Sequence, residues 1–164
     1  MAITREKKSE ILAKLSSILS SATSVVFVGF KGITGGDTTA MRRELKGEGV
    51  HYFVAKKRLV KKAIADTGVS GNIPELEGEL AIAYTEGEDT TAPARLIHEN
   101  AKKHEGLSIL GGVFESALAD AAKMTEIATI PPTPVLRGMF VNVINSPIQG
   151  FAVALKAIAD KKGE

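Results

Sequence analysis

The sequence of 164 residues contains no cysteine and no tryptophan, and only two tyrosines. Without cysteine the chain forms no disulfide, no thiolate metal site and no cysteine nucleophile. No stretch approaches the roughly 18 consecutive apolar residues of a membrane span, and residues 1–10 carry charges where a secretory signal has its apolar core. We therefore expect a cytoplasmic chain that does not enter a membrane, with one domain and an appendage.

Signatures of catalysis are also scarce. The sequence has three histidines, and His98 and His104 stand six residues apart, which does not place them on one helix face for metal binding. No Gly-x-Ser-x-Gly nucleophile motif is present. We expect no enzyme, no metal and no cofactor, and we interpret each histidine as a core or surface residue.

A glycine-rich segment, Gly29–Gly36, lies between a predicted strand and a predicted helix, where phosphate-binding loops occur. A nucleoside-triphosphate loop ends in Gly-Lys-Ser/Thr, whereas this one ends in Gly-Gly-Asp-Thr, and Asp37 would repel a phosphate. The pattern favours a plain connecting loop whose amides could meet an RNA phosphate. A small nucleotide-using enzyme built on this loop is the alternative from another class.

Charge is divided unevenly along the chain. Residues 1–64 hold 13 Lys and Arg against 5 Asp and Glu, a net of +8. Residues 65–164 hold 8 against 14, a net of −6, and the two add up to the +2 of the whole chain. Such asymmetry indicates a polyanionic partner for the first part.

Apolar periodicity predicts strands that alternate with helices. This order is typical of an α/β sandwich, and we expect a four-stranded mixed sheet flanked by helices. A glycine pair at 111–112 indicates a bend or bulge in the last strand. The predicted helices cover residues 3–22 (with Thr4 as a possible N-cap), 37–47 (capped by Asp37), 56–66 (ended by Gly68), 90–104 (started by Thr90 or Thr91) and 120–129, and the strands 24–30, 50–55, 79–85 and 107–114.

Three prolines, at positions 131, 132 and 134, predict a stiff extended joint between a domain of residues 1–130 and a helical tail of residues 131–164. In the tail, apolar pairs recur every four residues from 135 to 144, and Pro147 suits the first turn of a new helix. Apolar residues lie on several sides of that helix, so we expect several sides to be buried. The helix either folds back on its own domain or binds partners. The stiff joint and the core already supplied by four strands favour partners.

The helix predicted over residues 56–66 opens with five cations in seven residues. Like charges four residues apart destabilise a helix slightly, and cations in the first turn oppose the helix dipole. A charged face arranged against its own stability is typical of a phosphate-binding surface. Few aromatic residues lie among these cations, so we expect recognition of backbone and shape rather than base stacking.

Several short segments follow one another in a distinctive order and spacing. They are Phe30–Thr34 (FKGIT), Met41–Leu45 (MRREL), Gly49–Val54 (GVHYFV), Lys56–Leu59 (KKRL), Ala81–Ala83 (AIA), Ala92–Ala94 (APA) and Gly111–Gly112. Together they resemble the bacterial ribosomal stalk-base family, large-subunit ribosomal protein number ten, over nearly the whole chain. The similarity lies in the order and spacing of the segments rather than in any one of them, and Lys57 and Arg58 stand where that family usually has Asn and Thr.

The resemblance implies a structural protein of the large ribosomal subunit in the cytoplasm. The N-terminal domain would bind the GTPase-associated region of large-subunit rRNA beside a neighbouring ribosomal protein. The C-terminal helix, with room for two, would carry dimers of the acidic stalk protein, which recruit translational GTPases. A free-standing RNA-binding regulator of translation is the alternative.

Two groups of site residues follow from charge, apolar spacing and resemblance together. The residues expected at rRNA are Lys31, Gly32, Arg42, Arg43, Lys56, Lys57, Arg58, Lys61 and Lys62. The residues expected at the stalk dimers are Ile148, Phe151, Ala152, Leu155, Ile158 and Ala159.

Overall fold

The structure of the chain is a computed structural model that describes residues 5–67, 78–87, 89–104, 106–115 and 117–163. The chain divides into two compact units, Met1–Ile130 and Pro131–Glu164. The predicted N-cap Thr4 and the predicted helix end at Gly68 lie outside the described residues. The elements in chain order are α1 (Arg5–Ser21), β1 (Ser24–Phe30), α2 (Gly35–Gly47), β2 (Val50–Val54), α3 (Lys57–Thr67), β3 (Glu79–Thr85), α4 (Ala92–Lys103), β4 (Leu107–Phe114), β5 (Ala117–Asp120), α5 (Ala121–Ala128) and α6 (Thr133–Lys162).

The first unit is an α/β sandwich, as predicted, but its sheet differs from the expected four mixed strands. Five described strands pair in the order β2-β3-β1-β4-β5, and every pair is antiparallel. β1 and β2 run parallel to each other, but β3 lies between them and pairs with both. The expectation of a mixed sheet was wrong, because β3 keeps the two parallel strands β1 and β2 from pairing with each other. β5 was not predicted, since four residues rich in alanine carry little strand signal.

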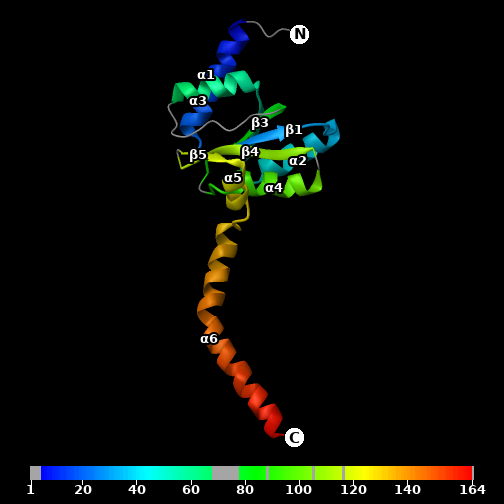
Figure 1. Cartoon of the computed structure of the whole chain (residues 1–164), viewed down its shortest axis with the longest axis vertical. Helices are drawn as coiled ribbons and strands as arrows, with labels where there is room; N and C mark the ends of the chain where they lie inside the picture. Colours follow the sequence, from blue (N-terminus) through cyan, green and yellow to red (C-terminus); the bar gives the residue numbers. More distant parts are fainter. Residues whose placement is uncertain (1–4, 68–77, 88, 105, 116, 164) are drawn as a thin grey trace. The chain divides into compact units, whose positions relative to one another are not determined.

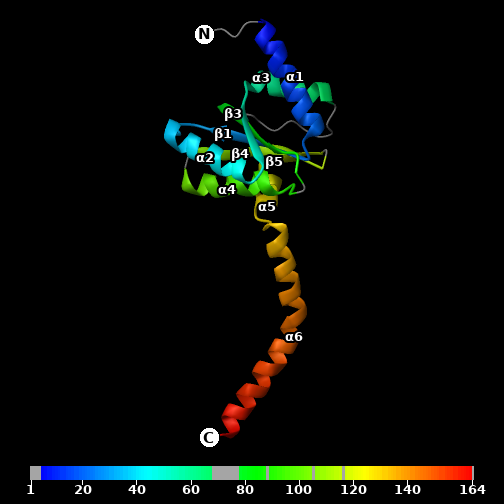
Figure 2. The same ribbon diagram turned by 180° about the vertical axis from the view of Figure 1, so that it is seen from behind.

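The helices cover the two faces of the sheet (Figures 1 and 2). α1 and α3 pack on one face over a core that includes Leu15, Phe27 and Ile64. α2, α4 and α5 pack on the other face, where Leu45, Ile97 and Met124 are buried. Because both faces are covered, β1 and β3 are nearly continuous apolar runs.

The predicted irregularity in β4 is confirmed. The register between β1 and β4 shifts after Phe27, which pairs with Gly111, while Val28 pairs with Ile109. Gly112 lies so close to the neighbouring strand that a Cβ atom there would collide with the carbonyl oxygen of Val25. The glycine pair therefore serves strand pairing and close packing.

Local hydrogen bonds begin two of the helices on the α2 face. Thr34, rather than the predicted Asp37, caps α2, since its hydroxyl oxygen accepts from the Asp37 backbone N–H at 3.2 Å. α4 begins after Thr91, as predicted, and the Asp89 carboxylate accepts from the Thr91 backbone N–H at 3.1 Å and from Arg95 at 3.0 Å. Burial raises the pKa of Asp89, but these hydrogen bonds outweigh it and leave the pKa below its ordinary value.

The second unit differs from its prediction in two respects. α6 is one helix of 30 residues that contains Pro147 in its interior, so the predicted break before Pro147 was wrong. An internal proline removes one backbone hydrogen bond and bends a helix without ending it, and Figure 2 shows α6 curved along its length. Pro134 lies in the first turn of α6 rather than in an extended joint, because a first-turn N–H has no helical partner to lose.

Candidate nucleic-acid interface and apolar tail helix

The five cations of the run 56–62 lie at the start of α3 and are all exposed. Val60 and Ala63 on the same helix are buried against the α1 side of the sheet. This spacing turns the apolar side of α3 inward and leaves the charged side at the surface. None of the five forms an ion pair with another described residue, so their charge is available to an external anion.

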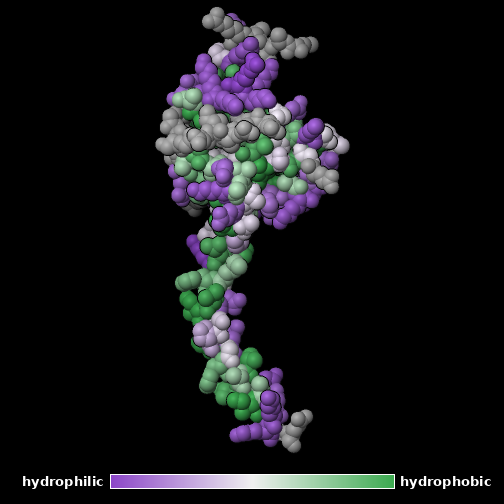
Figure 3. All heavy atoms as spheres, viewed as in Figure 1, coloured by the Kyte–Doolittle hydropathy of each residue, from purple (hydrophilic) through white to green (hydrophobic). Residues whose placement is uncertain are grey.

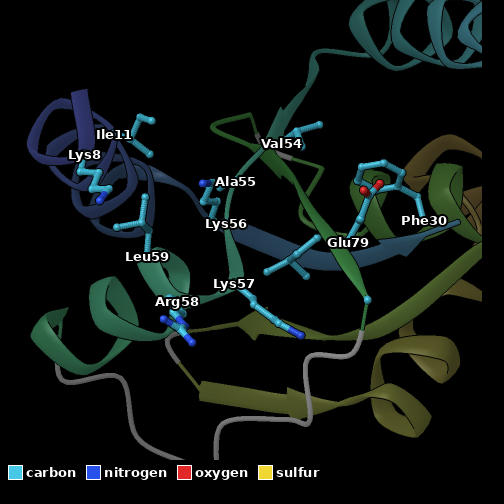
Figure 4. A pocket seen from close by; sticks show the side chains of 12 residues that line it. Lys8, Ile11, Phe30, Val54, Ala55, Lys56, Lys57, Arg58, Leu59 and Glu79 are labelled. Atoms are coloured by element: carbon cyan, nitrogen blue, oxygen red, sulfur yellow. The ribbon is translucent and has the colours of Figure 1, made fainter. Parts of the chain in front are cut away.

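A hollow opens beside the beginning of α3, with a volume of about 800 Å³ (Figure 4). Four cations line it, together with the single carboxylate of Glu79 and apolar residues that include Phe30 and Leu59. The four cations are Lys8, Lys56, Lys57 and Arg58. The lining therefore carries four positive charges against one negative charge, which favours an anion such as a phosphate.

The ends of two strands position this hollow. Phe30 pairs with Glu79, and Val54 pairs with Ala81 two residues further along β3, so β1 and β2 finish at the same end of the sheet. Lys31 follows β1 directly, and its backbone N–H donates to the Gly106 carbonyl at 2.8 Å. Gly32 adopts a positive φ of 72°, which lets the chain turn towards α2. The structure thus brings Lys31 to the end of the sheet where α3 begins.

The cations of α2 belong to the opposite face of the sheet. Arg42 and Arg43 are exposed on α2, which packs over the core of α4 and α5. The Arg42 guanidinium lies 5.4 Å from the centre of the Tyr52 ring, a cation–π contact at the edge strand β2. The predicted site residues are therefore divided between the two faces rather than gathered in one patch.

α1 contributes residues that the sequence interpretation did not include. Lys8 and Ile11 line the hollow, while Lys7 and Lys14 are exposed on the same helix. The cations of the first predicted helix were visible in the sequence and could have indicated this contribution, since the apolar spacing of that helix predicts that it packs on the sheet. The packing of α1 on α3 then adds its cations to those of residues 56–62.

The other polar residues considered in the sequence, Asp37 and the three histidines, lie in regular elements of the fold or at the end of one. Asp37 accepts from the Thr34 hydroxyl at 2.7 Å, which places a carboxylate at the start of α2. His51 lies on β2, while His98 and His104 lie on α4 and at its end. Within the described part of the chain, no group of three or more His, Cys, Asp and Glu side chains is arranged to hold a metal ion.

α6 exposes apolar side chains along its whole length (Figure 3). Phe151 is 67% exposed and Leu155 is 51% exposed, and none of the residues of α6 is buried. The other predicted contact residues, Ile148, Ala152, Ile158 and Ala159, are exposed as well. By length and composition, this helix meets the requirement for crossing a membrane, the one helix among the described residues to do so. So large an apolar surface marks a site of interaction.

Comparison with known proteins decides the family. Residues 3–102 match the family described as Ribosomal protein L10, and residues 131–164 match the Ribosomal protein uL10 C-terminal region. The chain belongs to the ribosomal protein uL10 family. It is 35% identical to large ribosomal subunit protein uL10 of Shouchella clausii (strain KSM-K16), over 97% of this chain and 95% of that protein. The uL10 proteins of Staphylococcus aureus strains JH9 and Newman show the same identity and coverage.

Membership in the uL10 family agrees with the resemblance seen in the sequence, and the relatives are ribosomal proteins rather than enzymes. The second match begins at Pro131, where the second compact unit begins. The basic hollow lies in the part matched by the L10 family, and α6 lies in the part matched by the uL10 C-terminal region. The two surfaces thus fall in separately matched segments.

Proposed function

We propose that the chain is a structural component of the large ribosomal subunit in the cytoplasm, where it forms the base of the stalk. Residues 1–130 bind large-subunit rRNA, at its GTPase-associated region, beside a neighbouring ribosomal protein. Residues 131–164 anchor dimers of the acidic stalk protein, and through them translational GTPases are recruited. The exposed apolar surface of α6, in a segment of uL10 type, carries this proposal.

The positive hollow supports the rRNA half of the proposal. Phosphate contacts supply most of the affinity of a protein for a nucleic acid, and they come from Lys, Arg and backbone N–H groups. Lys56, Lys57, Arg58 and Lys8 all line the hollow, whose lining holds one carboxylate. Lys61 and Lys62 extend the same charged side of α3 by one turn.

The chemistry of α6 supports the dimer half. An amphipathic or apolar helix is recognised by laying its apolar side chains into a groove of the partner. Arg137, Asn142 and Asn145 interrupt the apolar surface, which suits a protein groove with a polar rim better than the interior of a lipid bilayer. The helix runs upstream of Pro147 to Thr133 with the same exposed apolar pairs, so we expect at least two dimers on one chain.

Native mass spectrometry of the full-length chain, co-expressed with the acidic stalk protein, tests this half directly. The expected species is one chain with two or more dimers. The double variant Phe151→Asp with Leu155→Asp places two charges on the apolar side and should lose dimers. Its matched control, Asn142→Asp with Gln149→Asp, adds the same charge at polar positions and should keep them.

Each outcome of this experiment has a different meaning for the anchoring role. A full-length chain that carries no dimer, under conditions where it is folded by circular dichroism, would contradict the anchoring role. Equal loss of dimers from both double variants would mean that added charge, rather than the apolar side of α6, controls the contact. Lipid vesicles are added in a further experiment. A chain that inserts into vesicles and does not bind the dimers would indicate that a membrane, rather than the stalk protein, covers α6.

A further inference from the structure

A second cleft lies between α1 and the edge of the sheet, with a volume of about 350 Å³. This size falls at the lower end of the range for small-ligand sites. Its lining comes from α1 on one side and from β2, β3 and the residue after β3 on the other. The lining residues are Lys14, Ser17, Ile18, Ser21, Phe53, Tyr84 and Glu86.

The Phe53 and Tyr84 rings form the sheet side of this cleft, and His51 lies beside Tyr84 outside the lining. Tyr84 and His51 are register partners on β3 and β2, and their ring centres are 5.3 Å apart with an angle of 32° between the planes. Phe53 follows two residues later on the same face of β2. His51 is exposed, and Phe53 and Tyr84 are half-buried, so the rings are accessible at the surface.

The charge of this cleft differs from that of the hollow beside α3. Lys14 and Glu86 balance each other here, whereas four cations face one carboxylate in the hollow. The Ser21 hydroxyl donates to Glu86 at 3.1 Å, which holds that carboxylate beside the cleft. A phosphate would be attracted to the hollow and not to this cleft. A planar, uncharged group with N–H donors fits the cleft better, because it can stack on the rings and donate to Glu86.

The two surfaces follow each other along the same elements. Lys8 and Ile11 line the hollow, and Lys14 and Ser17 line the cleft about 10 Å further along α1, at 1.5 Å per residue. On the sheet side, Leu80 lines the hollow and Tyr84 lines the cleft, four residues apart on the same face of β3. A nucleic-acid strand held by its phosphates at the hollow therefore has an aromatic site within reach.

We propose that this cleft binds one unpaired nucleobase of the RNA whose phosphates occupy the hollow, by stacking on the Tyr84 ring. The proposal rests on the proposed RNA-binding function and adds a base-binding site to it. Sequence-specific recognition of RNA usually targets unpaired bases that stack on aromatic side chains. The cleft would thus give the basic surface a preference for a loop or bulge over a plain duplex.

The absence of tryptophan makes the test direct. Tyr52 and Tyr84 are the two tyrosines, so the variant Tyr52→Phe leaves Tyr84 as the single tyrosine fluorophore and keeps the ring under Arg42. The full chain with this change is titrated with an RNA fragment of the GTPase-associated region. We expect saturable quenching of Tyr84 emission that follows binding measured by filter retention. Repeating the titration with a fully paired duplex of equal length should give binding without quenching.

A second measurement uses affinity and its salt dependence. Tyr84→Leu should weaken binding to the fragment about 10-fold, within the range for loss of one stacked base, and leave the salt slope unchanged. Tyr84→Phe keeps the ring, so it is the matched control and should retain the affinity. Thermal unfolding of both variants is checked in parallel. His98→Ala, on the other face of the sheet, should change neither the affinity nor the slope.

Two negative results differ in meaning. If the fragment binds with its usual salt slope, but Tyr84 emission is constant and Tyr84→Leu binds as well as the unaltered chain, the base site is refuted and RNA binding stands. If the fragment does not bind the unaltered chain at all, the proposed RNA-binding function fails and the base site fails with it.

Discussion

Replacing Lys57, Arg58 and Lys61 by glutamine removes three exposed positive charges from α3. The buried side of the helix, with Val60 and Ala63, is left untouched. Lys57 and Lys61 are a like-charged pair four residues apart, so their neutralisation relieves a repulsion of a few tenths of a kcal/mol. The triple variant should therefore be at least as stable as the unaltered chain, and any loss of RNA binding reports on contacts with the RNA.

The magnitude follows from counterion release. Each phosphate neutralised by the protein contributes about 0.7 to 0.9 to the slope of log affinity against log salt, so three lost contacts flatten that slope by about 2 to 3. Between about 50 and 200 mM salt, this difference amounts to roughly a 20- to 40-fold smaller loss of affinity in the variant. The variant should bind more weakly at low salt and converge with the unaltered chain at high salt.

Filter binding to the rRNA fragment at four or five salt concentrations measures both quantities. The matched control replaces Lys102, Lys103 and Lys123, which lie on α4 and α5 over the other face of the sheet. It changes the net charge of the chain by the same amount and should preserve the slope. Equal flattening in both triple variants would refute the reasoning, because the effect would then come from net charge rather than from phosphates at α3.

Three further predictions concern stability. Gly112→Ala should lower the free energy of unfolding by about 1–3 kcal/mol in urea titrations, since its Cβ would meet the Val25 carbonyl oxygen and Met124, whereas Gly35→Ala, with open space around it, should change little. Asp89→Asn should lower stability at pH 7. Folding lowers the pKa of Asp89, so the ionised carboxylate stabilises the folded chain fully above the unfolded pKa of about 3.9. This stabilisation is lost as the pH falls through the folded pKa, so the free energies of unfolding of the two chains should converge in acid. A constant difference down to acid pH would contradict this. Pro147→Ala should raise the helical signal in far-ultraviolet circular dichroism and the thermal stability of α6, and an unchanged melting curve would argue against the continuous helix.

The regular elements of the first unit could be predicted from local patterns. β1, β3 and β4 have the predicted bounds, because each is a short apolar run ended by glycine or by polar residues. α3 was placed within one residue at each end among the described residues, since its apolar positions recur with helical spacing. The glycine pair in β4 also indicated its bulge, because a bulge needs a residue without a side-chain clash.

Elements whose form depends on neighbours were missed or misjudged. β5 carries almost no local signal and exists because β4 offers it an open edge. The sheet is antiparallel because β3, the third strand in the chain, enters between the first two, and no periodicity records such an insertion. Pro147 suggested a break, yet one lost hydrogen bond does not outweigh the bonds of the turns on either side.

For the functional surfaces, the sequence by itself determined the types of residue and their order along the chain. The cations of α3 and the apolar side chains of α6 stand in continuous segments, so both were visible without a structure. Only the tertiary structure decided which cations share a surface. It joined Lys8 of α1 to α3, assigned Arg42 and Arg43 to the other face, and brought Phe53 and Tyr84 beside Lys14. These residues are distant in sequence, and strand pairing and helix packing, which depend on the whole chain, are what bring them together.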